Sequence, residues 1–258
     1  MSTSPRLAVS PLPDRDALHG RVALVTGAGI RVGRAIALAL GARGMHVVVH
    51  YNGSRDGAMD TARLIRDAGG EASVEQANLA DVAEAERLID RVLSTHGSLW
   101  ALINSAAIML RTPLGEVSAE QWDSTFALNV RAPFFLAQRA APALRQSKGA
   151  IVNIADLAAF ESWPAYVPHA MTKAAIVHMT RNLARVLAPE VRVNAVAPGA
   201  VLLPNSWSEA DAARMSSTTP LARLGSPEDV AQTVLYLLDA EYVTGETIRV
   251  DGGRHVRC

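Results

Sequence analysis

The stretch "ALVTGAGIRVGRAIALAL" at residues 23–40 joins a short apolar run to a helix-length apolar segment through a glycine-rich turn. Such a turn lets backbone N–H groups and the N-terminus of a helix approach a pyrophosphate closely. The glycines Gly27, Gly29 and Gly33 do not have the spacing of the dinucleotide fingerprint G-x-G-x-x-G, which would need its third glycine at Val32. The stretch therefore predicts a strand, a tight turn and a helix, and by itself it is weak evidence for a particular ligand.

The rest of the chain repeats this alternation of apolar runs and helix-length segments. The apolar runs predict seven strands, near residues 21–27, 46–50, 72–78, 99–105, 150–156, 191–199 and 246–253. Amphipathic patterns predict helices at 31–43, 55–68, 82–96, 118–147, 166–188 and 227–239. Nearly continuous apolar strands separated by helices are typical of a mainly parallel sheet with helices on both faces. We therefore expect an α/β fold, a single doubly wound (Rossmann) domain over residues 19–258, preceded by a flexible leader at 1–18.

The composition argues against nucleic-acid and membrane partners. The 258 residues include 25 basic and 25 acidic side chains, so no net charge favours a polyanion or an anionic membrane surface. The leader lacks the apolar core of a signal peptide, and no stretch is long and apolar enough to span a membrane. The single cysteine, Cys258, excludes an intrachain disulfide. These features favour a cytoplasmic protein that acts on a small molecule.

Several motifs follow the glycine-rich turn in a fixed order. Thr26, Gly27 and Gly33 match the pattern T-G-x-x-x-G-x-G, with Arg31 in place of the middle glycine. The later motifs are "INSAA" at 103–107, "LNV" at 128–130, "VNIAD" at 152–156, "HAMTK" at 169–173, "NAVAPG" at 194–199 and "VDGG" at 250–253. Together they resemble the short-chain dehydrogenase/reductase family over about residues 20–257. The resemblance implies a seven-stranded Rossmann fold, a nicotinamide cofactor and a homotetramer.

Other residues resemble one branch of that family, the pteridine and dihydromonapterin reductases. That branch carries an arginine in the glycine-rich turn, H-Y-x-x-S after the second strand, and an aspartate in place of the usual catalytic serine. Here Arg31, "HYNGS" at 50–54 and Asp156 match those three features, and "VDGGRHVR" resembles the end of the dihydromonapterin reductases. The branch implies a pterin substrate and an Arg31 side chain that contacts both cofactor and substrate.

The segment after the second strand indicates which nicotinamide cofactor is used. An enzyme that selects NAD usually places an acid there for the ribose 2′-hydroxyl. The sequence "VVVHYNGSR" offers hydrogen-bond donors and Arg55 instead, which favours the 2′-phosphate of NADPH. With the resemblance, the expected cofactor-binding residues are Gly27, Arg31, Val32, Gly33, His50, Tyr51, Asn52, Ser54, Asn78, Leu79, Asn104, Ser105, Ala106, Lys173, Pro198 and Gly199.

The catalytic helix departs from the family pattern. The family uses a tyrosine as proton donor, a lysine four residues later that also binds the nicotinamide ribose, and an asparagine that holds a relay water. Lys173 and Asn129 are present, but alignment on Lys173 places His169 at the tyrosine position. Tyr166 corresponds to a second tyrosine of several pteridine reductases, and with His169 and Lys173 it falls on one helix face.

Three interpretations of this site stay open. In the first, His169 is the general acid, with Asp156 favouring its charged form and Lys173 opposing it. In the second, Asp156 donates the proton, Tyr166 orients the substrate and His169 fills space or accepts a hydrogen bond. In the third, the site is inactive and the fold only binds NADPH. The expected catalytic residues are His169, Lys173, Asp156, Asn129 and Tyr166, and the expected substrate contacts are Arg31, Asp156, Tyr166, His169, Leu202 and Trp207.

Further departures weaken the pterin assignment. Ser105, Ala107 and Asn78 each replace a residue that the resembling enzymes carry near cofactor or substrate. We therefore expect an NADPH-dependent reductase of a small planar C=N or C=O compound, most like a pterin. The alternatives are a ketone, sugar or natural-product reductase of the same family, and an NADPH-binding pseudoenzyme. The segment 202–220 has no clear strand pattern and is expected to form a mobile lid over the substrate.

A metal site is not expected. The H-x-x-x-H spacing of His46 and His50 falls in a predicted strand, and the single cysteine, Cys258, has only His255 near it, so neither pair makes a set of three or four ligands. The histidines His46, His50 and His96 are expected to lie far apart in the fold.

Overall fold

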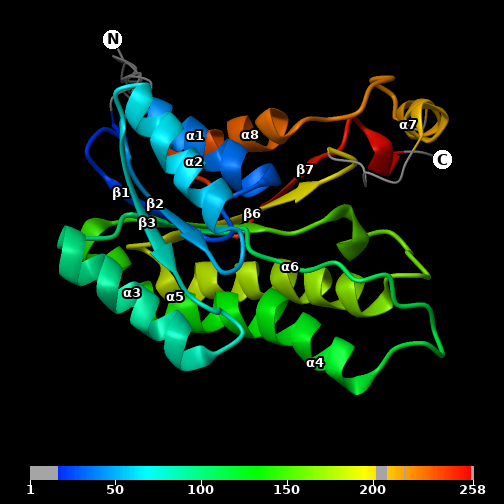
Figure 1. Ribbon diagram of the computed structural model, residues 1–258, viewed down its shortest axis with the longest axis horizontal. Coiled ribbons are helices and arrows are strands. Elements are labelled where there is room, and N and C mark those ends of the chain that lie inside the picture. The colour runs from blue at the N-terminus through cyan, green and yellow to red at the C-terminus, as the bar shows by residue number, and fades with distance from the viewer. Residues whose placement is uncertain (1–16, 202–207, 218, 257–258) are drawn as a thin grey trace, which may run out of the picture.

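The computed structural model describes residues 17–201, 208–217 and 219–256. Its centre is a sheet of seven parallel strands in the order β3-β2-β1-β4-β5-β6-β7 (Figure 1). The strands are β1 Val22–Val25, β2 His46–Tyr51, β3 Glu71–Gln76, β4 Ala101–Asn104, β5 Ala150–Ile154, β6 Arg192–Pro198 and β7 Thr247–Val250. The strand order reverses between β1 and β4, and ligands of doubly wound sheets bind at the carboxyl ends of strands beside such a reversal.

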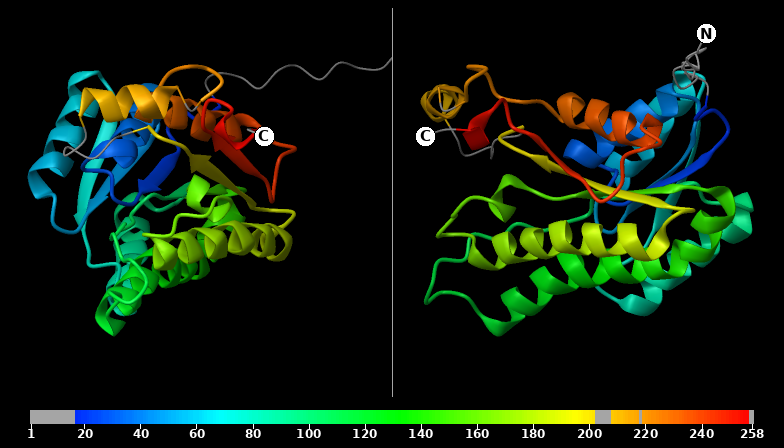
Figure 2. Two further views of the ribbon diagram at one scale, coloured as in Figure 1. Left: turned by 90° about the vertical axis from the view of Figure 1, so that its right-hand side faces the viewer. Right: turned by 180° about the vertical axis from the view of Figure 1, so that it is seen from behind.

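Helices cover both faces of the sheet (Figures 1 and 2). One face carries α1 Arg31–Ala42, α2 Arg55–Asp67 and α8 Pro227–Asp239, and the other carries α3 Val82–His96, α5 Ala132–Ser147 and α6 Val167–Leu187. The helices bury apolar residues against the strands, so apolar core clusters form on both faces. The predicted α/β fold with a doubly wound sheet is confirmed, and it is also the fold of related solved proteins described below.

The predicted helix at 118–147 is helical from residue 119 to residue 147, but it contains a π-helical turn that was not predicted. The structure has α4 Ala119–Phe126, a π-helical segment Ala127–Arg131, and then α5. The capping box of Ser118 and Gln121 starts α4, as the sequence pattern predicts. The π segment adds one residue to a turn, which a hydrophobic pattern of period 3.6 does not reveal. It buries Asn129, which is 1% exposed, beneath the functional region.

The folded part of the chain starts earlier than the predicted boundary at residue 19. Leu18 is 1% exposed and belongs to the apolar core that α1 and α2 cover. The backbone N–H of Gly20 also bonds the carbonyl of Gly44, 2.8 Å away. Leu18 is therefore a core residue. Residues 1–16 of the predicted leader lie outside the described residues.

The predicted lid region at 202–220 contains a helix. Residues 209–216 form α7 Glu209–Ser216, which starts at a capping box between Ser208 and Asp211. Helix α7 lies beyond the carboxyl ends of the strands, beside the C-terminal part of the chain (Figure 1). Leu202 and Trp207 lie outside the described residues. Among the helices that the structure describes, none is long and apolar enough to cross a membrane.

Candidate active site

A large cavity lies where the strand order reverses. Its volume is about 940 Å³, which is ample for a ligand of cofactor size. The cavity is formed by the glycine-rich turn, the segments after β2 to β6, and the start of α6. The predicted site residues that line it are Gly27, Arg31, Val32, Gly33, His50, Asn52, Ser54, Asn78, Leu79, Ser105, Ala106, Asp156, Tyr166, His169, Lys173, Pro198 and Gly199.

The glycine-rich turn is packed so tightly that two of its positions need glycine. A Cβ atom at Gly33 would overlap the carbonyl oxygen of Gly27 and lie 2.9 Å from its carbonyl carbon. Gly27 has φ of +65°, and a Cβ there would lie 2.9 Å from the Cα of Ala106. Arg31 keeps a glycine-like backbone, with φ of +55°, although it carries a side chain. A tight glycine-rich turn at the start of a helix is the arrangement that binds the phosphates of a dinucleotide.

Thr26 ties the ends of β1 and β4 together beside the turn. Its hydroxyl donates to the carbonyl of Ile103 and accepts the backbone N–H groups of Ser105 and Ala106, at 2.9 and 3.1 Å. Its backbone N–H also bonds the carbonyl of Ile103. Thr26 therefore fixes the floor of the cavity where the sheet reverses, which accounts for the need for a hydroxyl at this motif position.

His50 supports the turn from behind. It is 2% exposed, and its Nδ1 accepts the backbone N–H of Gly27 at 3.1 Å. Because Nδ1 accepts, Nε2 carries the hydrogen and donates to the carbonyl of Ala77, 3.0 Å away. Burial lowers the pKa of His50 to about 4, against a smaller opposing effect of the bond to Ala77. We expect His50 to hold the turn as a neutral ring, and not to contact the 2′-phosphate of a cofactor.

This burial predicts that the protein loses stability in mild acid. Unfolded chains bind a proton at histidine below about pH 6.5, while folded His50 resists protonation down to about pH 4. The contribution of neutral His50 to the free energy of unfolding is therefore complete above pH 6.5. It is lost as the pH falls from about 6.5 to about 4, by up to about 3 kcal/mol. Urea unfolding at pH 7, 6 and 5 measures the loss. The His50→Asn variant should show a shallower slope with pH, and an unchanged slope would contradict the assignment.

The start of α6 holds His169, the residue that the resemblance places at the family's tyrosine position. His169 is 3% exposed, and its Nδ1 lies 3.2 Å from the carbonyl oxygen of Ile108. The same carbonyl accepts from Nδ2 of Asn129 at 2.9 Å, and Oδ1 of Asn129 accepts the N–H of Ile108. Nδ2 of Asn129 also donates to the hydroxyl of Thr172, which donates to the backbone carbonyl of His169. Asn129 thus holds both the backbone at Ile108 and the turn of α6 from His169 to Thr172, and these set the position of the imidazole of His169.

The other imidazole nitrogen faces Asp156. A carbonyl only accepts, so Nδ1 of His169 carries a hydrogen and Nε2 is left facing Oδ2 of Asp156 at 3.6 Å. Nε2 is buried and has no hydrogen-bond partner. Oδ1 of Asp156 is already used, because it accepts the backbone N–H of Ala158 at 2.8 Å. Nε2 of His169 is therefore the unsatisfied polar atom of this pair, and it lies opposite Oδ2 of Asp156.

Lys173 lies one helical turn beyond His169. Its ammonium group is buried and donates to the carbonyl of Ile154, 2.8 Å away. Burial lowers the pKa of Lys173 to about 8, and the Asp156 carboxylate opposes this shift. Lys173 is therefore mostly charged at neutral pH and loses its charge as the pH rises through about 8. The cavity thus combines a buried cation, a buried imidazole and a half-buried carboxylate.

Of the predicted site residues that the structure describes, three do not line the cavity. Tyr51 ends β2 and packs against the apolar core of that face. Asn104 is 5% exposed and donates to Oδ1 of Asn153 at 2.8 Å, and Asn153 donates to Thr180. Asn129 is buried behind Ile108, as described above. These corrections share one reason, because the motif order gives position along a strand or helix but not the direction in which a side chain points.

Several residues that line the cavity were not predicted from the sequence. They come from connecting segments, from α7 and from the C-terminal end, and they include Met109, Trp163, Met215 and Arg254. A segment after β4 and another before α6 run side by side, since the N–H of Thr112 bonds the carbonyl of Ala165 at 2.8 Å. Residues brought in by such long-range pairings carry no local sequence signal.

The expectation that the three histidines lie far apart was wrong for one pair. The rings of His46 and His96 have centroids 4.2 Å apart, and the hydroxyl of Ser73 lies within 3.3 Å of both Nε2 atoms. The start of β2 and the end of α3 meet there beside Ser73 of β3. Because these residues are far apart in the sequence, no local pattern predicts the contact. The part of the chain that the structure describes contains no group of three or more His, Cys, Asp or Glu side chains placed to hold a metal ion.

Comparison with known proteins extends over almost the whole chain. The family model for enoyl-(acyl-carrier-protein) reductase matches residues 27–255. The 3-oxoacyl-(acyl-carrier-protein) reductase FabG of Staphylococcus aureus is 37% identical over 240 residues, which cover 91% of this chain and 98% of that protein. The similarity therefore includes the catalytic helix and the C-terminal motifs, and is not confined to the glycine-rich turn.

Solved structures agree with the sequence matches. A blue fluorescent protein from a metagenomic library, solved in complex with NADPH, has a TM-score of 0.86 and 32% identity, covering 92% of this chain and 98% of its own. A variant of a Serratia marcescens short-chain dehydrogenase/reductase has a TM-score of 0.86 and 31% identity, with the same coverage. Both the sequence and the fold point to the same class of protein.

Proposed function

The chain belongs to the short-chain dehydrogenase/reductase family, and from this premise we propose that it is an NADPH-dependent reductase of a small planar C=N or C=O compound, most like a pterin. Membership makes it an oxidoreductase with a nicotinamide cofactor. The finer assignment depends chiefly on one observation, that Nε2 of His169 faces Oδ2 of Asp156 at 3.6 Å in the cavity. This pair lies where the family places its proton donor.

The choice of NADPH is supported by the residues after β2. Asn52, Gly53 and Ser54 line the cavity there, and the first acid that follows, Asp56, is in the exposed first turn of α2. A carboxylate that would repel a 2′-phosphate is therefore absent from this part of the lining. Arg31 lines the cavity at the start of α1 and would add positive charge near the phosphates. Arg55, which we expected to add a second charge, does not line it.

The bound cofactor would supply a hydride, and the chain's own residues would supply the proton. Of the facing pair, Asp156 is the more accessible member, with a side chain that is 22% exposed against 3% for His169. We assign the transfer to Oδ2 of Asp156, which passes to the substrate the proton that Nε2 of His169 holds. The pair then takes up one proton from solvent through the more exposed Asp156 carboxylate, which returns it to Nε2. Lys173 keeps a positive charge beside the pair and would bind the ribose. Asn129 positions His169 through Ile108.

The walls of the cavity favour a flat substrate. Tyr166 and Trp163, whose rings meet edge to face with centroids 6.2 Å apart, both line the cavity, together with the apolar side chain of Met109. Aromatic and apolar walls with a few polar groups suit a planar heterocycle. The alternative of an open-chain carbonyl substrate has its own support, since the FabG relative is a 3-oxoacyl reductase. The homotetramer and the cytoplasmic location stay predictions.

A substrate panel tests this proposal. NADPH oxidation should be measured with dihydrobiopterin, dihydromonapterin, acetoacetyl thioesters and small ketones, and NADH should be compared with NADPH on the best substrate. We expect turnover with at least one planar or β-keto substrate and a preference of about 10-fold or more for NADPH. Binding of NADPH without turnover of any substrate would contradict the reductase and favour a pseudoenzyme. Equal rates with NADH would contradict the cofactor assignment alone.

A further inference from the structure

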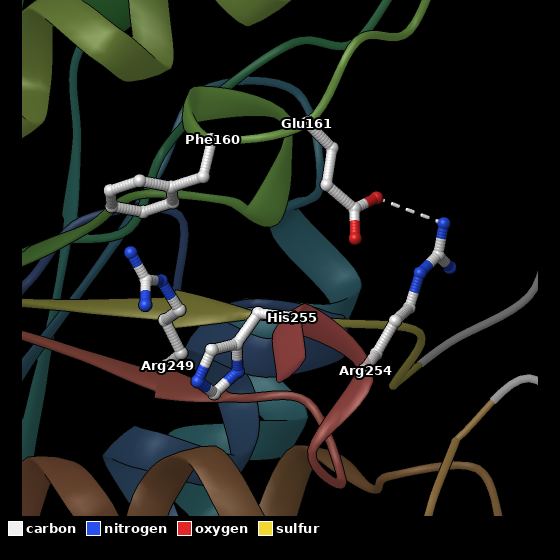
Figure 3. Close-up of a pocket in the computed structure, with 5 residues that line it drawn as sticks. All are labelled: Phe160, Glu161, Arg249, Arg254 and His255. Carbon is white, nitrogen blue, oxygen red and sulfur yellow. Dashed lines mark hydrogen bonds and ion pairs between the residues drawn. The ribbon is translucent and has the colours of Figure 1, made fainter. Parts of the chain in front are cut away.

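A second cavity lies beside the proposed active site. It has a volume of about 490 Å³ and is lined by Phe160, Glu161, Arg249, Arg254 and His255. Figure 3 shows these side chains gathered between the segment after β5, strand β7 and the C-terminal turn. Three of the five lining residues carry nitrogen groups that donate hydrogen bonds, and only one is acidic. The composition of this cavity therefore differs from the apolar walls of the larger one.

Arg249 is the basic group of this cavity that has no acidic partner. Its guanidinium lies over the ring of Phe160, 4.2 Å from the centroid (Figure 3). Within the described residues it forms no ion pair with a carboxylate. Stacking on the ring fixes the plane of the guanidinium and leaves its N–H groups free to bind in that plane. A stacked and unpaired guanidinium is well suited to hold a planar carboxylate or a phosphate at two points.

The other two basic residues are held by acids. Arg254 pairs with Glu161 at 2.9 Å, as the dashed line in Figure 3 marks. Nδ1 of His255 donates to Oδ2 of Asp251 at 2.8 Å, and the backbone N–H of His255 bonds the same oxygen. Since Nδ1 is used by Asp251, Nε2 of His255 is the nitrogen left for a ligand. Glu161 and Asp251 thus fix the basic side chains around Arg249.

Arg254 also connects the two cavities. Besides Glu161, its guanidinium contacts the sulfur of Met215 in α7 at 3.0 Å, and both Arg254 and Met215 line the larger cavity. A molecule that extends from the larger cavity past Arg254 would enter the second cavity, which Arg249 also lines. The second cavity therefore adjoins the larger one at Arg254.

We propose that the cavity of Phe160, Arg249, Arg254 and His255 binds a carboxylate or phosphate group carried by the substrate, at the end remote from the reduced bond. Arg249 makes the main contact, and Arg254 and His255 flank it. This inference rests on the proposed function, because it assigns a tail to that function's substrate. It predicts that compounds with an anionic tail are better substrates than neutral compounds with the same reducible group.

Matched substrates test the proposal. Dihydrofolate carries carboxylates that dihydrobiopterin lacks, and acetoacetyl-CoA carries phosphates that acetoacetyl-N-acetylcysteamine lacks. The variant is Arg249→Gln, which should fold because Arg249 is exposed, and the control is Arg87→Gln, which removes an exposed charge from α3. We expect Arg249→Gln to lower kcat/KM for at least one anionic substrate by about 10-fold to 100-fold, through KM. Neutral substrates, and every substrate with the control, should be unaffected.

A binding experiment separates failure of this proposal from failure of the proposed function. Calorimetric titration of the NADP complex with dihydrofolate and acetoacetyl-CoA gives Kd values even when no substrate turns over. If Arg249→Gln and Arg87→Gln bind dihydrofolate and acetoacetyl-CoA with equal affinity, the tail site is overturned, whether or not the enzyme is active. If inorganic phosphate binds in an Arg249-dependent way while neither tail has any effect, the cavity is a site for free anions and the proposal also fails.

Discussion

Replacing His169 with Phe should lower kcat by about 10²-fold to 10⁴-fold, the usual contribution of a positioned acid or base. The phenylalanine keeps the aromatic ring but cannot hold a proton opposite Oδ2 of Asp156. The affinity for NADPH should change little, because His169 is not among the expected cofactor contacts. Steady-state kinetics on the best substrate, together with a fluorescence titration of NADPH, measure the two effects separately.

Two further variants distinguish the members of the pair. Asp156→Asn should lower kcat at least as strongly as His169→Phe if Asp156 makes the final transfer. A fully active Asp156→Asn enzyme would instead make His169 the direct donor, and full activity of His169→Phe would remove the histidine from the mechanism. His169→Tyr restores the residue that the family normally uses. It should recover part of the lost rate, with a pH profile that differs from wild type below about pH 8, where Lys173 keeps its charge.

Replacing Gly33 with Ala should weaken NADPH binding by about 100-fold or more and lower the free energy of unfolding by about 1 to 3 kcal/mol. The added methyl group would overlap the carbonyl of Gly27, so the turn must move away from α1. The contact is with backbone, which cannot rotate out of the way as a side chain can. Isothermal titration with NADPH and urea unfolding measure the two effects.

Gly53→Ala is the matched control for this change. Gly53 lines the same cavity, but a Cβ atom there would meet nothing within 4 Å. We expect its NADPH affinity and stability to stay near those of wild type. If Gly33→Ala behaves like Gly53→Ala, the tight packing of the turn has no functional role.

The fold was predictable because its signals are local. Each strand is a short apolar run, and the turns and caps between them, such as Ser226 before α8, carry their own residue preferences. The π-helical turn between α4 and α5 was not predictable, since it adds one residue to a turn without interrupting the helix. Leu18 was assigned to the leader because one apolar residue among polar ones gives no periodicity, although it packs in the core.

The site was predictable where a motif fixes both position and direction. His169, Asp156 and Lys173 lie at the ends of elements whose geometry repeats across the family, and the structure brings all three to one cavity. Arg254 and Trp163 were missed because their places depend on how connecting segments fold against one another. Asn104 was placed in the cavity from its motif, yet its side chain points along the sheet toward Asn153.

The hydrogen-bonded row of Asn104, Asn153 and Thr180 limits how this protein can be engineered or can diverge. In this buried row Asn104 donates to Asn153 and Asn153 donates to Thr180, so exchange of a single member leaves a buried polar partner without its hydrogen bond. Changes there are therefore epistatic, and a mutational library that varies one member at a time would mostly recover unstable proteins. New substrate specificity is more accessible through Met109 and Trp163, which line the cavity from connecting segments outside that row.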